Sequence, residues 1–383
     1  MTKILYLVHD LCDPAVRRRV AMLHAGGAQV LLAGFRRGTD SAVPDELDHA
    51  PVVLGETKDG AFGQRIAKVA AALLSGELKH LAAFAPAVIL ARNLEMLALG
   101  ERIAGSIRPR PRLIYETLDI HRLLLDQGMA GLALRALERR LAARTAFVLT
   151  SSPAFVDNYL RPVQGFEDIR LQENKVLDLE EARPPLRDAD TGSRNPIRIG
   201  WFGALRCARS LSILSRLAED GEGSLEVTLR GRPARREFED FDAQVSGRPH
   251  LSFHGPYRAE DLVEIYGAVD LVWAIDFFEQ GLNSDWLLPN RVYEGCAHGA
   301  VPIALAGTQT AGFLRERGIG IICDDLSPEA LARQLREVDI AALKAAVRAL
   351  APETFRSGRA ECRKLVAALA GAPDAPSHRA EAA

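Results

Sequence analysis

The sequence predicts an α/β protein that contains two successive parallel sheets. Short apolar runs alternate with amphipathic stretches along all 383 residues, which is the pattern of strands joined by helical crossovers. A polar segment rich in turn-forming residues interrupts this alternation at 182–196, and we interpret it as an exposed linker. The alternation then starts again, and at about 150 residues per domain the chain length suits more than one domain.

The first half of the chain contains strand and helix patterns in regular alternation. Asp13 followed by Pro14 predicts a helix start with an N-cap and a proline at the first helical position. Ser152 before Pro153 repeats this signal, and we interpret it as a structural cap. The predicted strands are 4–8, 29–33, 52–54, 87–90, 112–115 and 147–150, and the predicted helices are 14–25, 63–84, 95–106 and 131–144.

The second half repeats the architecture without a fixed-period sequence repeat. An Ala-rich helical stretch follows residue 338, and the small, polar residues 371–383 predict a disordered tail. We therefore predict an N-terminal domain over 1–170, completed by a C-terminal helix at about 351–370, and a C-terminal domain over 171–350. The predicted strands of this half are 197–202, 226–229, 251–253, 271–274, 301–305 and 320–323.

The composition excludes several classes of protein. With 48 Lys+Arg and 50 Asp+Glu the formal charge is −2, so the chain lacks the positive field that nucleic-acid binders use. The five cysteines are scattered and form no C-x-x-C pair, which argues against a disulfide framework or a zinc site. No apolar run approaches the roughly 20 residues that cross a bilayer, and no export signal is seen, so we expect a cytoplasmic protein.

Polar residues that could carry chemistry follow two predicted strands of the first half. Open α/β sheets bind ligands beyond the carboxyl ends of their strands. His9 follows the first strand, and Glu116, Asp119 and His121 follow the strand at 112–115, a density that suits proton transfer or the orientation of a hydroxyl. The alternative is an ordinary helix start, with Asp119 as its cap and Glu116 solvated. No G-x-G-x-x-G motif follows the first strand, which argues against a dehydrogenase.

The second half carries an anion-binding pattern. Gly203 ends a strand, and Arg206 and Arg209 lie at the start of the helix predicted at 210–219. Cations at a helix N-terminus oppose the helix dipole, so they favour a bound phosphate or diphosphate there. Gly231 follows the next strand with arginines on both sides, and we expect it to line the same site.

Glu294 lies in an apolar helix that Pro289 opens. A lone glutamate on a helix is usually a solvated charge, but its neighbours in the helix are small or apolar. An unpaired buried carboxylate is costly, so a partner such as a pair of sugar hydroxyls is plausible.

The motifs resemble those of a known family of glycosyltransferases. The segment LPNRVYE at 288–294, followed by GAVPIA at 299–304, resembles the donor-site segment of family 4-like glycosyltransferases of the GT-B fold. Gly203 with Arg209 resembles the phosphate loop of that family, ENKV at 173–176 its interdomain entry, and TSS at 150–152 the turn that ends its N-terminal domain. The opening of the chain looks closest to bacterial exopolysaccharide transferases of the succinoglycan-assembly type.

The resemblance implies two Rossmann-like domains that face each other across a cleft. It implies that Glu294 holds the ribose hydroxyls of a nucleotide sugar and that Arg209 neutralises the diphosphate, without a metal. It also implies acceptor-side catalytic groups, with Asp119 or His121 orienting or deprotonating the acceptor hydroxyl. The expected donor-site residues are Gly203, Arg206, Arg209, Gly231, Asn290, Arg291 and Glu294, and the expected catalytic residues are Asp119, His121, Glu116 and His9.

Three positions depart from the family pattern. The family's first glutamate, eight positions before Glu294, falls at Trp286, with Asp285 adjacent. The phosphate-loop arginine aligns with Ala204, and Arg206 is a candidate substitute. The usual glycine pair after the first strand is also absent.

The expected reaction is metal-independent transfer of a hexose from a nucleotide sugar, such as UDP-glucose, to a polyprenyl-diphosphate-linked oligosaccharide, with no cofactor. A lipid-linked acceptor favours contact between the N-terminal domain and the inner face of the cytoplasmic membrane. Residues 1–170 hold 22 Lys+Arg and 18 Asp+Glu, a net +4, which leaves −6 for the rest. The helical stretches at 63–84 and 128–144 are rich in Ala, Leu and cations, a pattern that ordinary surface helices also show. The cations are Arg65, Lys68, Lys79, Arg135, Arg139, Arg140 and Arg144.

Three other functions fit parts of the pattern. A nucleotide-sugar epimerase of the same fold would use the nucleotide site without a lipid acceptor. A non-catalytic partner protein would keep the fold but not the chemistry, in line with the missing glutamate and glycine pair. A dehydrogenase would need the glycine motif that is absent here.

Overall fold

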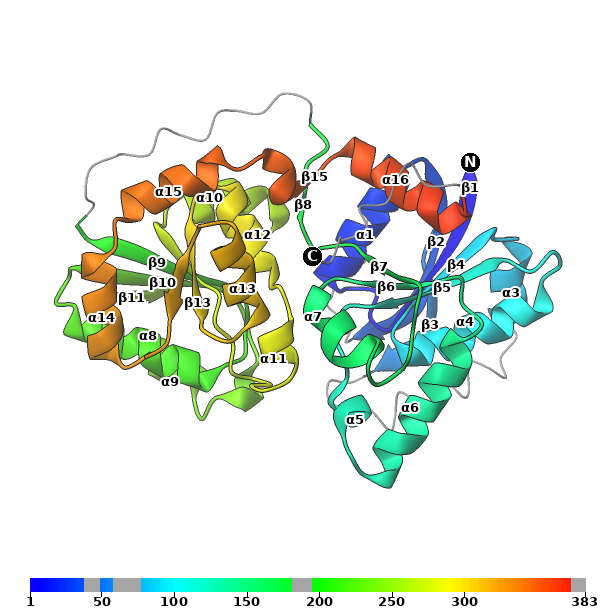
Figure 1. Ribbon diagram of the computed structural model, residues 1–383, viewed down its shortest axis with the longest axis horizontal. Helices are drawn as coiled ribbons and strands as arrows, with labels where there is room; N and C mark the ends of the chain where they lie inside the picture. Colours follow the sequence, from blue (N-terminus) through cyan, green and yellow to red (C-terminus); the bar gives the residue numbers. More distant parts are fainter. Residues whose placement is uncertain (38–48, 58–76, 181–194, 373–383) are drawn as a thin grey trace. The chain divides into compact units, whose positions relative to one another are not determined.

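The computed structural model describes residues 1–37, 49–57, 77–180 and 195–372 (Figure 1). The chain divides into two compact units. Unit 1 comprises Met1–Glu173, Leu177–Leu179 and Ser357–Ala383, and unit 2 comprises Asn174–Val176 and Glu180–Arg356. The chain passes between the units at β8 (Val176–Leu177) and β15 (Arg356–Ser357), which pair with each other. Most of the predicted linker at 182–196, most of the predicted helix at 63–84 and the tail beyond 372 lie outside the described residues.

Within the described residues, unit 1 is built on a seven-stranded parallel sheet of order β3-β2-β1-β4-β5-β6-β7. Its strands are β1 (Thr2–Val8), β2 (Ala28–Arg37), β3 (Val52–Thr57), β4 (Val88–Arg92), β5 (Arg112–Thr117), β6 (Val148–Thr150) and β7 (Ile169–Leu171). Its helices are α1 (Pro14–Ala25), α3 (Glu77–Ala83), α4 (Leu94–Ser106), α5 (Arg122–Leu125), α6 (Met129–Ala142), α7 (Pro153–Phe155), the π-helix η1 (Val156–Leu160) and α16 (Arg359–Ala370).

Helices cover both faces of the sheet in unit 1. Side chains of α1 and α16 join those of the sheet in one apolar core, and the central strand β1 contributes Tyr6 to it. Helix α4 packs on the other face of the sheet, against Ile89 and Leu113, and the absence of a side chain at Gly100 lets the helix approach these residues closely. As predicted, Asp13 caps α1 by accepting a 2.8 Å hydrogen bond from the amide of Ala15. The N-terminal half thus forms one doubly covered parallel sheet.

Among the described residues of unit 2, a second parallel sheet has the order β11-β10-β9-β12-β13-β14. Its strands are β9 (Ile197–Leu205), β10 (Leu225–Pro233), β11 (Leu251–Phe253), β12 (Leu271–Trp273), β13 (Val301–Leu305) and β14 (Ile321–Cys323). Its helices are α8 (Ala208–Asp220), η2 (Arg235–Glu237), α9 (Phe241–Val245), η3 (Ala259–Asp261), α10 (Leu262–Gly267), α11 (Asn283–Trp286), α12 (Asn290–Ala297), α13 (Gln309–Glu316), α14 (Pro328–Glu337), α15 (Ile340–Ala349) and η4 (Pro352–Thr354).

Two apolar clusters stabilise unit 2. The larger one joins α8, α12, α13 and α14 to the sheet around Trp201 and Trp273. The smaller one joins α10 to the sheet through Phe202 and Tyr266. The predicted α/β class with parallel sheets is confirmed. In the described part of the chain, no helix is both long and apolar enough to cross a membrane.

Several strands run further toward their carboxyl ends than the sequence predicts. β5 continues through Glu116 and Thr117, and β10 continues through Arg230 to Pro233. Backbone pairing with the neighbouring strand continues past the last apolar residue, so hydrophobicity alone ends the strand too early. Glu116 therefore lies within a strand and not in the turn after it.

Candidate functional site

Two glycines bring β9 and β10 together at the carboxyl edge of unit 2. Gly231 pairs with Gly203, and a Cβ atom on Gly231 would lie 1.8 Å from the carbonyl oxygen of Gly203. Their φ angles of 138° and 104° also favour glycine. The structure thus places these two predicted site residues together, with the hydroxyl of Tyr257 3.8 Å from the position of a Cβ on Gly203.

Glu294 is held by a buried tyrosine. It lies in the second turn of α12, which begins directly after Pro289, as the sequence predicts. The Tyr266 hydroxyl, on α10, donates a 2.8 Å hydrogen bond to Glu294 Oε2. Burial, followed by the charge of Glu294, raises the pKa of Tyr266 well above its ordinary value, so the phenol remains a donor. The half-buried carboxylate therefore has a fixed orientation.

Aromatic rings surround this pair. Phe202 contacts the Tyr266 ring edge-on at 5.0 Å between centroids, and His298 stacks on Tyr266 at 5.9 Å. Tyr257 lies edge-on to Phe202 at 6.4 Å, and burial and then the charge of Glu294 raise its pKa. Glu294 and the glycine pair thus belong to one region, since Tyr257 faces both.

The first turn of α12 holds two further predicted residues. Arg291 is buried, and its Nη1 donates to the backbone oxygen of Trp273 at 3.4 Å, at the end of β12. Asn290 is half-buried and is the first residue of the helix. The guanidinium of Arg291 therefore joins α12 to the carboxyl end of the sheet.

The two arginines before and within α8 have different surroundings. Arg206 Nη2 forms an ion pair with Asp276 at 3.0 Å, and its guanidinium lies over Phe278. Arg209, one residue inside α8, stacks on the Phe277 ring at 4.1 Å and donates to Gln280 Oε1 at 3.3 Å. The charge of Arg206 is neutralised by the Asp276 carboxylate. The contacts of Arg209 with a neutral ring and a neutral amide do not neutralise its charge, so Arg209 is better suited to bind an anionic ligand.

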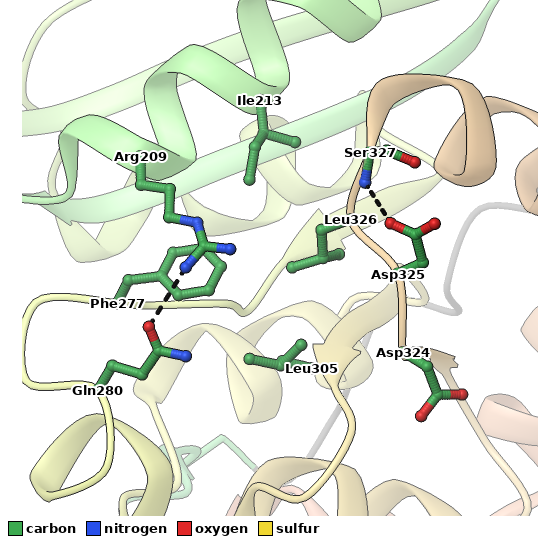
Figure 2. A pocket seen from close by; sticks show the side chains of 9 residues that line it. All are labelled: Arg209, Ile213, Phe277, Gln280, Leu305, Asp324, Asp325, Leu326 and Ser327. Atoms are coloured by element: carbon green, nitrogen blue, oxygen red, sulfur yellow. Dashed lines mark hydrogen bonds between the residues drawn. The ribbon is translucent and has the colours of Figure 1, made fainter.

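Arg209 borders a pocket of about 440 Å³ in unit 2 (Figure 2). Figure 2 shows its guanidinium against Phe277 on one side of the pocket, with Asp324 and Asp325 on the other. The pocket lies beyond the carboxyl ends of β13 and β14, where open α/β sheets bind ligands. The lining residues are Arg209, Ile213, Phe277, Gln280, Leu305, Asp324, Asp325, Leu326 and Ser327.

Glu116 forms a buried ion cluster in unit 1. Its Oε1 accepts from Arg19 Nε at 2.8 Å, and its Oε2 accepts from Arg92 Nε at 2.8 Å and from the Tyr6 hydroxyl at 2.6 Å. Burial alone would raise the pKa of Glu116, but Arg92, Arg19 and these hydrogen bonds lower it to about 2. Contrary to the expectation from the sequence, Glu116 is neither solvated nor suited to accept a proton, because cations bind both of its oxygens.

His9 lies at the junction of the two central strands of unit 1. It follows β1 and is half-buried, and the Asn93 amide nitrogen lies 3.2 Å from its Nδ1 atom. Asn93 directly follows β4, the neighbour of β1. Strand order reverses direction between β1 and β4, which is where such sheets bind ligands.

Asp119 and His121 lie in the turn after β5. Asp119 is exposed, and its backbone oxygen accepts a 2.9 Å hydrogen bond from the Thr117 hydroxyl. His121, and not Asp119, is the N-cap of α5, since its Nδ1 accepts from the Leu123 amide at 3.3 Å. The structure therefore gives His121 a capping contact and leaves the Asp119 side chain at the surface.

Sequence comparison identifies a relative with an established biosynthetic context. The chain is 47% identical to the succinoglycan biosynthesis protein ExoL of Rhizobium meliloti (strain 1021), over an alignment that covers 97% of this chain and 94% of that protein. The chain belongs to the ExoL family. No family model matches the chain.

The fold of this ExoL-family protein matches solved glycosyltransferase structures. HepE of Anabaena, solved with UDP and glucose, superposes with a TM-score of 0.68 at 18% identity, covering 97% of this chain and all of HepE. Sucrose-phosphate synthase of Thermosynechococcus elongatus gives 0.62 at 16% identity, covering 97% and 96%. WaaG, a glycosyltransferase of lipopolysaccharide biosynthesis, gives 0.60 at 15% identity, covering 95% and 99%. The predicted GT-B fold and the resemblance to succinoglycan-type proteins are therefore confirmed.

Sequence reasoning missed several residues that contact the predicted site residues within each unit. Tyr257 and Tyr266 lie in a segment without a recognisable motif, and only the fold brings them to Gly203 and Glu294. Asn93 precedes a helix in an ordinary capping position, so its sequence context predicts a cap. These residues contact the predicted site residues from other helices and strands, and such contacts cannot be predicted from the spacing of residues along the sequence.

Proposed function

We propose that this ExoL-family protein is a glycosyltransferase of exopolysaccharide biosynthesis that transfers a hexose from a UDP-sugar, such as UDP-glucose, to a polyprenyl-diphosphate-linked oligosaccharide. The observation that carries the proposal is the carboxylate of Glu294, oriented by Tyr266 near the Gly203–Gly231 backbone. The family of ExoL and the fold shared with HepE, which was solved with UDP-glucose, support the same conclusion.

The donor would be bound by unit 2. A carboxylate with a fixed orientation can accept hydrogen bonds from two neighbouring ribose hydroxyls. The guanidinium of Arg209 and the N-terminal amides of α8 would stabilise the negative charge of the diphosphate as it leaves. Such charge stabilisation by fixed cations and dipoles needs neither a metal nor a cofactor.

The acceptor chemistry would use residues of unit 1. In the transfer, an acceptor hydroxyl oxygen forms a bond to the anomeric carbon of the hexose, the bond from that carbon to UDP breaks, and the hydroxyl proton is released. Asp119 is the exposed carboxylate near the end of β5 and is our candidate to accept this proton. His9 and His121 remain candidates to contact the substrate, and Glu116 supports the site from within the core.

A surface for the lipid-linked acceptor is offered by α6. Its inner face is fixed by Glu138, which accepts hydrogen bonds from the hydroxyls of Tyr115 at 2.6 Å and Tyr159 at 2.5 Å. Its outer face exposes Met129 by 83%, Leu132 by 52% and Leu137 by 42%. Exposed apolar side chains of this size favour contact with another apolar phase.

The predicted cations of this region have different roles. Arg135 is buried and donates to the backbone oxygen of Leu124, and Arg144 pairs with Glu101. Arg139 donates to the backbone oxygen of Val163, whereas Arg140 is exposed on α6. Lys79 is exposed on α3, and Arg65 and Lys68 lie outside the described residues. We propose that the outer face of α6 contacts the cytoplasmic membrane surface, with Arg140 near anionic lipid.

Calorimetric titration tests the donor site. The protein is titrated with UDP, GDP and UDP-hexoses in the presence of EDTA, and we expect UDP-selective binding. Glu294→Gln should weaken UDP binding at least tenfold, whereas Glu264→Gln on the exposed side of α10 is the matched control and should not. Absence of binding to every nucleotide would contradict the proposed donor site.

Product analysis distinguishes the rival functions. A transferase leaves a UDP-hexose unchanged until a lipid-linked acceptor is added, whereas an epimerase converts the UDP-hexose alone. UDP binding without turnover on any polyprenyl-diphosphate oligosaccharide would favour a non-catalytic protein of the same fold.

Vesicle sedimentation tests the membrane surface. The protein should sediment with vesicles that contain anionic lipid, and Leu132→Glu should reduce the bound fraction severalfold. Val263→Glu is the control, because Val263 is 65% exposed on α10 in unit 2. Equal losses for both variants would contradict a specific role of α6.

A further inference from the structure

Asn93 has an unusual backbone and an unusual partner. Its φ of 70° and ψ of 166° lie in a region that glycine occupies almost exclusively. It is the N-cap residue of α4, yet its side chain makes no capping hydrogen bond. Asparagine is among the best N-cap residues, so both features indicate that the side chain is directed elsewhere. It contacts His9, with 3.2 Å between Asn93 Nδ2 and His9 Nδ1.

The buried core of unit 1 maintains this backbone. The backbone N–H of Asn93 donates to the backbone oxygen of Glu116 at 2.9 Å, and the backbone oxygen of Asn93 accepts from the backbone N–H of Leu97 at 3.0 Å. Its neighbour Arg92 is buried and paired with the Glu116 side chain. The ion cluster of Glu116 thus fixes the end of β4, and a strained residue persists only where the surroundings determine its conformation.

The contact selects one form of the His9 ring. An amide NH2 group only donates hydrogen bonds, so a hydrogen bond in this arrangement requires His9 Nδ1 to accept, and the neutral ring would then carry its hydrogen on Nε2. A ring in this form cannot accept a proton at Nε2 and can only donate a hydrogen bond there.

We propose that Asn93 is a positioning residue that fixes the orientation and tautomer of His9, so that His9 donates a hydrogen bond from Nε2 to a substrate oxygen and does not act as the base. The proposal rests on the proposed transferase function. His9 after β1 and Asn93 after β4 would together present one N–H group to the substrate. Asp119 would remove the proton of the acceptor hydroxyl.

The tautomer can be measured without turnover. Protein labelled with ¹⁵N-histidine is examined by long-range ¹H–¹⁵N correlation NMR at a pH where the His9 ring is neutral, and His9→Gln assigns the signals. We expect the hydrogen on Nε2 in the wild-type protein. Asn93→Asp places an acceptor beside Nδ1 and should move the hydrogen to Nδ1. Asn158→Asp, an exposed position in η1, is the matched control and should change nothing.

Kinetics then test the role of the N–H group. Asn93→Asp should lower the kcat of hexose transfer at least tenfold and change the KM for the UDP-sugar less than twofold. Asn93→Gly, which tolerates the backbone but lacks the amide, should show both tautomers and an intermediate kcat. This variant keeps the test valid if the aspartate variant does not fold.

The outcomes separate this proposal from the proposed function. A wild-type ring with its hydrogen on Nδ1 would overturn the proposal whatever the activity. A tautomer change without a change in kcat would overturn the role of His9 as a donor. Absence of transfer by the wild-type protein would overturn the proposed function and with it the substrate contact, while the NMR result would still decide the Asn93–His9 contact.

Discussion

The hydroxyl of Tyr266 lies 2.8 Å from Glu294 Oε2 and orients that carboxylate at the carboxyl edge of unit 2. Tyr266 is itself fixed, because it is fully buried and packed edge-on against Phe202. A carboxylate that is oriented before the ligand arrives loses little freedom on binding. The strength of UDP binding should therefore depend on a residue that need not touch the nucleotide.

Removal of the tyrosine hydroxyl tests this dependence. Tyr266→Phe should weaken UDP binding by roughly tenfold, because a hydrogen bond to a charged group contributes about 1.5–3 kcal/mol. Titration calorimetry gives the affinity, and circular dichroism shows whether the fold is kept. Glu294→Ala should weaken binding more. If Tyr266→Phe binds UDP like the wild-type protein, Tyr266 does not orient the carboxylate.

Substitution of Asp119 should separate binding from transfer. Asp119→Ala removes an exposed carboxylate, while the turn keeps the hydrogen bond from Thr117 to the backbone oxygen of residue 119. We expect unchanged UDP affinity and loss of hexose transfer by at least a hundredfold, a typical contribution of general base catalysis. Asp157→Ala, at another exposed position of unit 1, is the control for transfer assays with a lipid-linked acceptor. Full activity of Asp119→Ala would refute the assignment.

Glu116 should matter for stability more than for chemistry. Glu116→Gln removes the buried countercharge that Arg19 and Arg92 share and leaves Arg92 its 3.5 Å pair with Asp13. Loss of one partner of a buried ion pair costs about 3–5 kcal/mol. Urea denaturation followed by circular dichroism measures this loss. A stability equal to that of the wild-type protein would show that the cluster contributes no net stability.

The same residue predicts an acid-sensitive fold. The pKa of Glu116 is lowered from its ordinary value of 4.5 to about 2 in the folded protein. Its stabilisation is therefore fully present above pH 4.5 and is lost as the pH falls toward 2, because the unfolded chain binds the proton first. Unfolding free energies measured between pH 6 and pH 3 should fall more steeply for the wild-type protein than for Glu116→Gln. Parallel curves would contradict this linkage.

The sequence predicted the fold well because hydrophobic periodicity and helix caps are local signals. The start of α1 at Pro14, the start of α12 after Pro289 and strand β13 were all placed correctly. Strand ends were less predictable, since β5 continues through Glu116 by pairing with its neighbours. A charged residue at the end of a strand looks solvated until the partners that bury it are known.

The candidate site was predictable only where a motif is contiguous. Gly203 and Glu294 belong to recognisable segments, but the partner Tyr266 is 28 residues from Glu294 and has no local signal. The contact of Asn93 with His9 spans 84 residues and depends on the adjacency of β1 and β4. Such contacts follow from strand order, which a single sequence does not reveal.

The Gly203–Gly231 pair gives the last prediction, which concerns both stability and binding. An alanine at 231 would place its Cβ 1.8 Å from the carbonyl oxygen of Gly203, and it would have to adopt a φ of 138°. Backbone cannot yield as a flexible side chain can, so we expect Gly231→Ala to separate β9 from β10 at this end and to destabilise the protein by about 1–3 kcal/mol.

Nucleotide binding should fall with it, because Gly203 would move relative to Tyr257 and the aromatic cluster around Glu294. Gly267→Ala is the matched control, since its Cβ would meet no atom within 4 Å and the residue is helical. Thermal unfolding with and without UDP measures both effects. If Gly231→Ala unfolds at the wild-type temperature and keeps its UDP-induced shift, the close backbone approach of β9 and β10 is not needed for the fold or for UDP binding.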